Sequence, residues 1–126
     1  IWLDGGHNLE ASNIIKNIIE KWKKENVFLV IGMMIGKNPY SFIKKLAKNL
    51  SAIFLLPIPD HQYIRPYEIK NNIKKDISSK ISIECSLDIK EVLKIIKENY
   101  SSGKIVICGS LYLAGEILKQ DGFKIN

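Results

Sequence analysis

Hydrophobic positions along the chain follow two alternating patterns. Five short runs are rich in Ile, Val, Leu and Phe, and three of them are almost continuously apolar. Continuous apolar runs of this length are typical of parallel strands that are covered by helices on both faces of a sheet. The five predicted strands are IWLD (1–4), VFLVIGM (27–33), AIFLLPI (52–58), ISIEC (81–85) and KIVICG (104–109).

The segments between these runs have the spacing of amphipathic helices. Apolar side chains recur every three or four residues, with Lys and Glu on the opposite side. Pro39 suits a first helical position and Asp88 suits an N-cap. The predicted helices span residues 8–25, 39–50, 65–79, 88–99 and 110–120, and the third has the weakest pattern. This alternation predicts one α/β domain over residues 1–126, with three layers and a mostly parallel sheet.

Composition and charge narrow the class of protein. The chain is 46% apolar and 25% charged, as in ordinary globular domains. No apolar run approaches the roughly 20 residues of a membrane span, and the start lacks the features of a secretory signal, so we expect a cytoplasmic protein. The net charge of +6 comes almost entirely from lysine, because Arg65 is the single arginine. Nucleic-acid contacts favour arginine, so the lysines indicate a solvated surface and no nucleic-acid partner.

The two cysteines do not form a recognisable site. Cys85 and Cys108 are far apart in the sequence and neither has a histidine at metal-ligand spacing. Each lies in or at the end of a β-like run, so we predict buried free thiols. Asp4 and His7 lack the further ligands that a metal site needs, and we predict no metal site in this chain.

Polar residues gather where three of the predicted strands end, which is where parallel sheets bind ligands. These segments are DGGHN (4–8), GMMIGKNP (32–39) and CGSLYLAGE (108–116). Free N–H groups at a helix N-terminus attract anions, and glycine lets a ligand approach the backbone. Each segment also has a purely structural interpretation: DGG fits a tight turn, and Ser110 fits a helix cap. The second segment lacks the complete phosphate-binding loop motif, and Asp60 with His61 fits a surface turn.

Four segments resemble one known family. LDGGHNLEAS (3–12) is similar to the D-G-A-H-N-P motif that opens the C-terminal domain of folylpolyglutamate synthases and dihydrofolate synthases, in the Mur ligase superfamily. CGSLYLAGEIL (108–118) is similar to their G-S-L-Y-L-x-G-E segment. VIGMMIGKNPYSF and LLPIP resemble two further stretches of the family. Gly6 and Leu9 replace the usual Ala and Pro, and Gly36 and Asn38 replace two usual aspartates.

The resemblance implies an ATP-dependent ligase of folate biosynthesis. Such an enzyme activates a carboxylate of dihydropteroate or folate as an acyl phosphate and joins it to the amine of L-glutamate. The chain would be its Rossmann-like C-terminal domain, with five to six strands, and would be monomeric and inactive alone. Its partner would be an N-terminal ATPase domain, absent from this chain, that holds most of the Mg²⁺ ligands. By motif, Asp4, His7 and Asn8 would contact the nucleotide, and His7 and Ser110 the glutamate.

Two other functions stay open at this point. One is an amino-acid ligase domain for peptidoglycan precursors in the same superfamily, which GSLYLAGE disfavours. The other is a standalone α/β nucleotide-binding or regulatory module. The polar cluster at the very start of the chain favours a domain of a longer enzyme over such a module.

Overall fold

Strands and helices alternate along the chain in the computed structural model, which describes residues 2–3, 9–73, 77 and 80–109. The strands are β1 (Trp2–Leu3), β2 (Val27–Ile31), β3 (Ala52–Leu55), β4 (Ser82–Cys85) and β5 (Lys104–Cys108). The helices are α1 (Leu9–Glu20), α2 (Pro39–Leu46), α3 (Pro66–Asn72) and α5 (Ile89–Asn99), with a 3₁₀ turn η1 (Ala47–Asn49) directly after α2. The helix predicted at 110–120 lies outside the described residues.

All neighbouring strands of the sheet are parallel, and their order is β1-β5-β2-β3-β4. Four strands have four or five residues, and the two-residue β1 extends the sheet beside β5. The predicted α/β class and parallel sheet are confirmed. No sixth strand occurs among the described residues.

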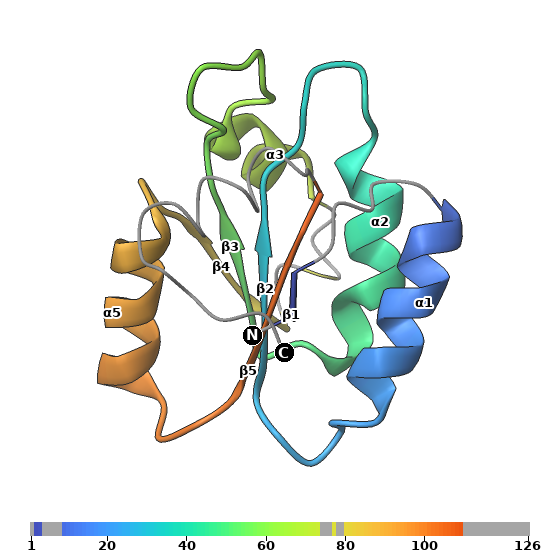
Figure 1. Cartoon of the computed structure of the whole chain (residues 1–126), viewed down its shortest axis with the longest axis vertical. Helices are drawn as coiled ribbons and strands as arrows, with labels where there is room; N and C mark the ends of the chain where they lie inside the picture. Colours follow the sequence, from blue (N-terminus) through green and yellow to red (C-terminus); the bar gives the residue numbers. More distant parts are fainter. Residues whose placement is uncertain (1, 4–8, 74–76, 78–79, 110–126) are drawn as a thin grey trace.

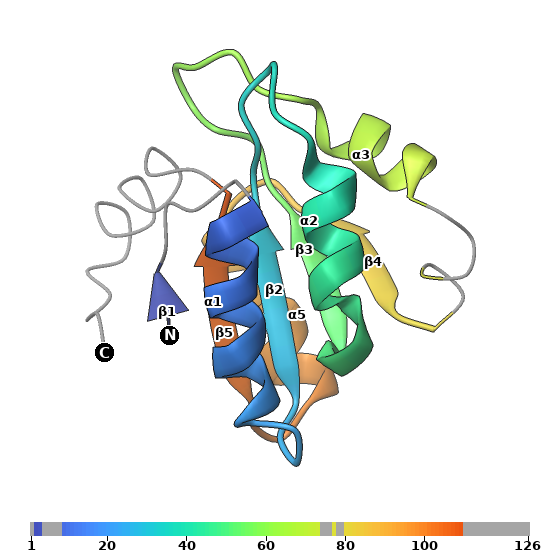
Figure 2. The same cartoon turned by 90° about the vertical axis from the view of Figure 1, so that its right-hand side faces the viewer.

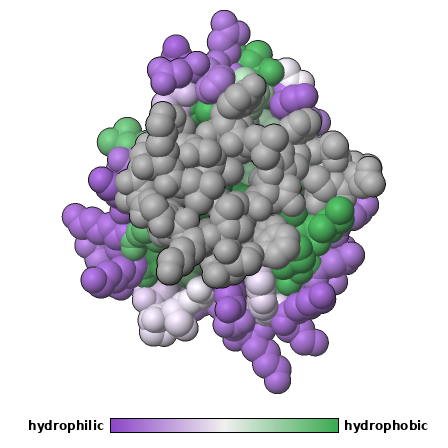
Figure 3. Space-filling view, viewed as in Figure 1, coloured by the Kyte–Doolittle hydropathy of each residue, from purple (hydrophilic) through white to green (hydrophobic). Residues whose placement is uncertain are grey.

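The sheet is the middle layer, with α1, α2 and α3 over one face and α5 over the other (Figures 1 and 2). Side chains of β2 alternate between the two faces: Leu29 and Ile31 pack on the α1–α2 side, and Phe28 and Val30 pack on the α5 side. All five residues of β2 are buried, which explains its uninterrupted apolar sequence. Hydrophilic side chains lie around the margins of the view in Figure 3.

Helix starts agree with the sequence signals better than helix ends do. Asn38 caps α2, because its side-chain oxygen accepts hydrogen bonds from Tyr40 N at 3.0 Å and Ser41 N at 3.4 Å. Asp88 caps α5 by accepting from Glu91 N at 2.9 Å. By contrast, α1 ends at Glu20 and α3 ends at Asn72, so both are shorter than predicted.

The prediction for the two cysteines is half right. Cys108 is buried in the core, but Cys85 is exposed. The reason is that β4 lies at the edge of the sheet and buries only Ile83 among its four residues. Partial burial raises the pKa of the Cys85 thiol, and the nearby Lys70 ammonium opposes that shift.

Adjacent residues of α1 provide a test of this packing. Ile15 is fully buried against the sheet, whereas the side chain of Ile14 is 54% exposed. We expect Ile15→Ala to lower the free energy of unfolding by about 2–5 kcal/mol, because it leaves a cavity in the core. Ile14→Ala, the matched control, should change it by less than about 0.5 kcal/mol. Urea unfolding followed by circular dichroism measures both, and equal losses would contradict the packing of α1.

Candidate functional site

The carboxyl ends of the strands meet at one edge of the sheet, at the top of Figure 1. β1 and β5 are neighbours there, with Trp2 opposite Val106 and Leu3 opposite Ile107. The segments that follow Leu3 and Cys108 therefore leave the sheet from adjacent strands at the same edge. These segments carry Asp4, His7, Asn8 and Ser110, all of which lie outside the described residues, so their contacts remain predictions.

The ends of β2 and β5 approach each other closely at this edge. Gly109 follows β5 directly and has a φ of +98°. A Cβ atom at this position would lie 2.5 Å from the carbonyl oxygen of Gly32 and 2.9 Å from Ile31 Cγ1. Since real Cβ atoms do not come so close to a backbone oxygen, only glycine fits both the conformation and the space. The backbone at Gly109, which directly precedes Ser110 in the sequence, is thus held close to Gly32.

The loop between β2 and α2 contains Gly36 and Asn38, two of the four residues that depart from the family pattern. Gly36 has a φ of +93° and is exposed, with nothing within 4 Å of a Cβ at its position. The side chain of Asn38 caps the N-terminus of α2. The intervening Lys37 is exposed and donates its backbone N–H to Met34 O at 3.3 Å. Gly36 and Asn38 therefore both serve the shape of this loop.

A second loop, between β3 and α3, is hydrogen-bonded to the first through the backbone. Met34 and Tyr63 form an antiparallel bridge. Ile35 N donates to Gln62 O at 3.2 Å, and Ile64 N donates to Met33 O at 2.8 Å. The two loops thus project together from the carboxyl edge (Figure 1). Sequence reasoning missed these hydrogen bonds, because a single bridged pair leaves no periodic signal.

Asp60 and His61 form a turn within that second loop, as the structural interpretation predicted. His61 N donates to Ile58 O at 3.3 Å, and Asp60 has a φ of +63°. Pro59 precedes Asp60, so the turn has the residue pattern of type II, with proline first and a positive φ second.

Large apolar side chains are exposed close to the same edge. Ile35 is 60% exposed in the β2–α2 loop, Tyr67 is 51% exposed in the first turn of α3, and Leu87 is 78% exposed just before α5. Ser86, next to Leu87, is buried, and its hydroxyl has no hydrogen-bond partner. An edge that combines a tight glycine turn, hydrogen-bonded loops and exposed apolar side chains is suited to contacts with a ligand and with another protein surface.

Two further searches covered the described part of the chain. It contains no group of three or more His, Cys, Asp and Glu residues arranged to hold a metal ion. None of its helices has the length and apolar character that crossing a bilayer requires.

Comparison with known proteins identifies the family. The model of the family described as "Dihydrofolate synthetase, C-terminal domain" matches residues 1–120. The chain belongs to this family. Its membership agrees with the resemblance that the motifs at both ends of the sequence indicated. The "Probable dihydrofolate synthetase" of Schizosaccharomyces pombe is 31% identical over 134 aligned positions, which cover 94% of this chain and 30% of that protein.

Solved structures share the fold of this chain. The folylpolyglutamate synthase of Mycobacterium tuberculosis, complexed with ADP and AMPPCP, matches with a TM-score of 0.75 at 10% identity, over 98% of this chain and 30% of that one. The bifunctional folylpolyglutamate synthase/dihydrofolate synthase of Yersinia pestis, complexed with AMPPNP and Mn ion, matches with a TM-score of 0.69 at 16% identity, over 96% of this chain and 28% of that one. The chain thus spans less than a third of each relative.

The two glycines with positive φ provide a test of the close approach at the carboxyl edge. Gly36→Ala should lower the free energy of unfolding by about 1–2 kcal/mol, the cost of a left-handed conformation for alanine. Gly109→Ala carries the same cost and also the clash with Gly32, so we expect about 1–3 kcal/mol more. Urea unfolding of both variants measures the difference, and equal effects would contradict the close contact between the ends of β2 and β5.

The cap of α2 provides a second test. Asn38→Ala should destabilise the protein by about 1 kcal/mol, because Tyr40 N and Ser41 N lose their acceptor. Asn38→Asp restores the residue that is usual in the family and keeps an acceptor at the positive end of the helix, so it should be at least as stable as the wild type. Thermal unfolding compares the three proteins. A loss in Asn38→Asp equal to that in Asn38→Ala would show that capping is not the role of this residue.

Proposed function

We propose that this chain is the C-terminal domain of a two-domain, ATP-dependent ligase that joins L-glutamate to dihydropteroate. In this reaction ATP transfers its γ-phosphate to the carboxylate of dihydropteroate and leaves as ADP. The glutamate amine then attacks the acyl phosphate, loses a proton and displaces phosphate to form the amide. The observation that carries the proposal is the match of residues 1–120 to a family named for dihydrofolate synthetase. The 31% identity to the Schizosaccharomyces pombe protein, whose name includes the same activity, supports it.

The proposed contribution of this chain is to position the nucleotide and the glutamate. Asp4, His7 and Asn8 would contact the nucleotide, and His7 and Ser110 would contact the glutamate. The pairing of β1 with β5 supports these roles, because it starts both segments from adjacent strands. The backbone at Gly109, held close to Gly32, supports the role of Ser110 as a hydrogen-bond donor to a carboxylate. Holding the amine against the acyl phosphate in this way lowers the entropic part of the barrier.

The proposed partner of the domain is an N-terminal ATPase domain that binds Mg²⁺ and most of the ATP. A partner domain at the carboxyl edge would cover three exposed apolar side chains, those of Ile35, Tyr67 and Leu87, and their exposure supports such a contact. The AMPPNP and Mn ion named for the Yersinia pestis enzyme support ATP and a divalent cation as cofactors. On this proposal the enzyme is cytoplasmic and monomeric, and the chain alone does not turn over.

Extension of folates with further glutamates is the second candidate activity. The names of the solved relatives favour it, since the Mycobacterium tuberculosis protein is a folylpolyglutamate synthase and the Yersinia pestis protein is bifunctional. Both activities use the same chemistry at the same edge of this domain, and they differ in the pterin substrate.

Kinetics of the full-length enzyme test the proposal. We expect glutamate-dependent release of ADP with dihydropteroate, and none from the 126-residue chain alone. Ser110→Ala should raise KM for glutamate by about 10- to 100-fold, the loss of a hydrogen bond to a charged group, and should leave KM for ATP nearly unchanged. The control is Ser101→Ala, at an exposed serine that precedes β5 at the opposite edge of the sheet.

Three outcomes would contradict these assignments. Release of ADP that needs no pterin would contradict the folate substrate. A wild-type KM for glutamate in Ser110→Ala would contradict the role of Ser110. Turnover by the isolated chain would contradict the need for a partner domain.

A further inference from the structure

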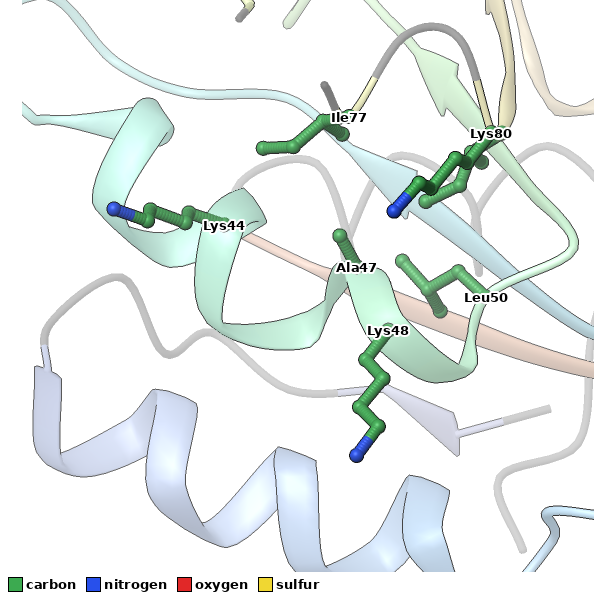
Figure 4. A pocket seen from close by; sticks show the side chains of 7 residues that line it. Lys44, Ala47, Lys48, Leu50, Ile77 and Lys80 are labelled. Atoms are coloured by element: carbon green, nitrogen blue, oxygen red, sulfur yellow. The ribbon is translucent and has the colours of Figure 1, made fainter.

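A cavity of about 480 Å³ lies on the far side of the domain from the carboxyl edge. It opens between α2 with η1 and the connection that leads from α3 to β4 (Figure 4). Leu50 lies two residues before β3 and Ile81 directly precedes β4, so the cavity lies where these strands begin. The residues that line it are Lys44, Ala47, Lys48, Leu50, Ile77, Lys80 and Ile81.

The floor of this cavity is apolar. Ala47, Leu50 and Ile81 are buried and belong to the core cluster beneath α2, and Ile77 packs against the same cluster. In Figure 4 the side chain of Ile77 lies across from those of Ala47 and Leu50. Its volume lies in the range of about 300–1,000 Å³ that is usual for sites that bind small molecules. The floor therefore suits the apolar body of a small ligand.

The rim of the cavity is cationic. Lys44 and Lys48 lie one helical turn apart, and Lys80 comes from the opposite wall. Figure 4 shows the ammonium of Lys80 directed over Ala47 and Leu50, whereas Lys44 and Lys48 extend outward from the helix. Among the described residues that line the cavity, none is acidic. Within the described part of the chain, no carboxylate lies within the 4.0 Å ion-pair distance of any of these three ammonium groups.

We propose that this cavity binds a small organic anion with an apolar body and a phosphate or carboxylate group. The apolar body would lie on the floor that Leu50, Ile77 and Ile81 form. The anionic group would lie beside Lys80, whose ammonium is directed over that floor, and Lys48 would turn toward it from the rim. Both halves of the ligand are needed: the floor removes apolar surface from water, and the lysines balance the charge at the rim. The site is separate from the carboxyl edge, so the proposal does not depend on the ligase activity.

Methyl NMR tests the proposal with phenyl phosphate as the probe. In protein labelled at isoleucine δ1 methyl groups, phenyl phosphate should shift the Ile77 and Ile81 signals in a saturable way. Inorganic phosphate lacks the apolar body and benzyl alcohol lacks the charge, so each should bind at least about tenfold more weakly, a difference that titration resolves well. The effect of phenyl phosphate should decrease at high salt, because exposed ion pairs are screened.

Matched lysine variants distinguish binding in the cavity from a general attraction of the anion to the positively charged protein. The double variant Lys48→Gln with Lys80→Gln should weaken the binding of phenyl phosphate by about 3- to 10-fold, because two exposed ion pairs are lost. Lys94→Gln with Lys97→Gln makes the same change of charge on exposed residues of α5, across the sheet, and should leave binding unchanged. Amide spectra confirm that the variants are folded. Unsaturable shifts, equal weakening in both double variants, or benzyl alcohol binding as tightly as phenyl phosphate would each overturn the proposal.

Discussion

The pairing of β5 with both β1 and β2 is the constraint on which the arrangement of the domain depends. β5 is the last described strand, yet it lies between the first two strands of the chain. It pairs with β2 along five residues, from Val27 opposite Lys104 to Ile31 opposite Cys108. β1 has only β5 as a neighbour in the described sheet. Since parallel strands end at one edge, this order brings together two segments that are about a hundred residues apart in the sequence.

β2 and β5 are interior strands of the sheet and pack against side chains on both of its faces. Every residue of β2 is buried, and Phe28 packs on the α5 side against Phe54 and Tyr100, with ring centroids 6.4 and 4.7 Å apart. At the carboxyl edge the same two strands end in backbone contact between Gly32 and Gly109. The position of the backbone at Gly109 therefore depends on main-chain packing against Gly32 as well as on side chains of the core.

The sequence predicted those features that leave a local signal. β2, β3 and β5 were evident because burial on both faces produces continuous apolar runs, and α2 and α5 began as predicted because Pro39 and Asp88 mark their first turns. The exposure of Cys85 was missed because it depends on β4 being the edge strand, and strand order arises from pairing between distant segments. The candidate site residues rest on motif resemblance alone. The adjacency of β1 and β5, from which their segments start, depends on strand order, which leaves no local signal in the sequence. The hydrogen bonds between the loops after β2 and β3 join segments that are distant in the sequence, so no local pattern predicted them.

The loop after β2 shows how a departure from a family motif can preserve structure while it changes charge. An aspartate at position 36 would adopt the left-handed conformation at a cost of about 1–2 kcal/mol, which glycine avoids. An aspartate at position 38 would cap α2 as Asn38 does, but with a negative charge. The substitutions thus keep the turn and the helix start and leave Lys37 without acidic neighbours in sequence. In this chain the loop therefore contributes its shape and one positive charge, whereas the family pattern would contribute two negative charges beside the lysine.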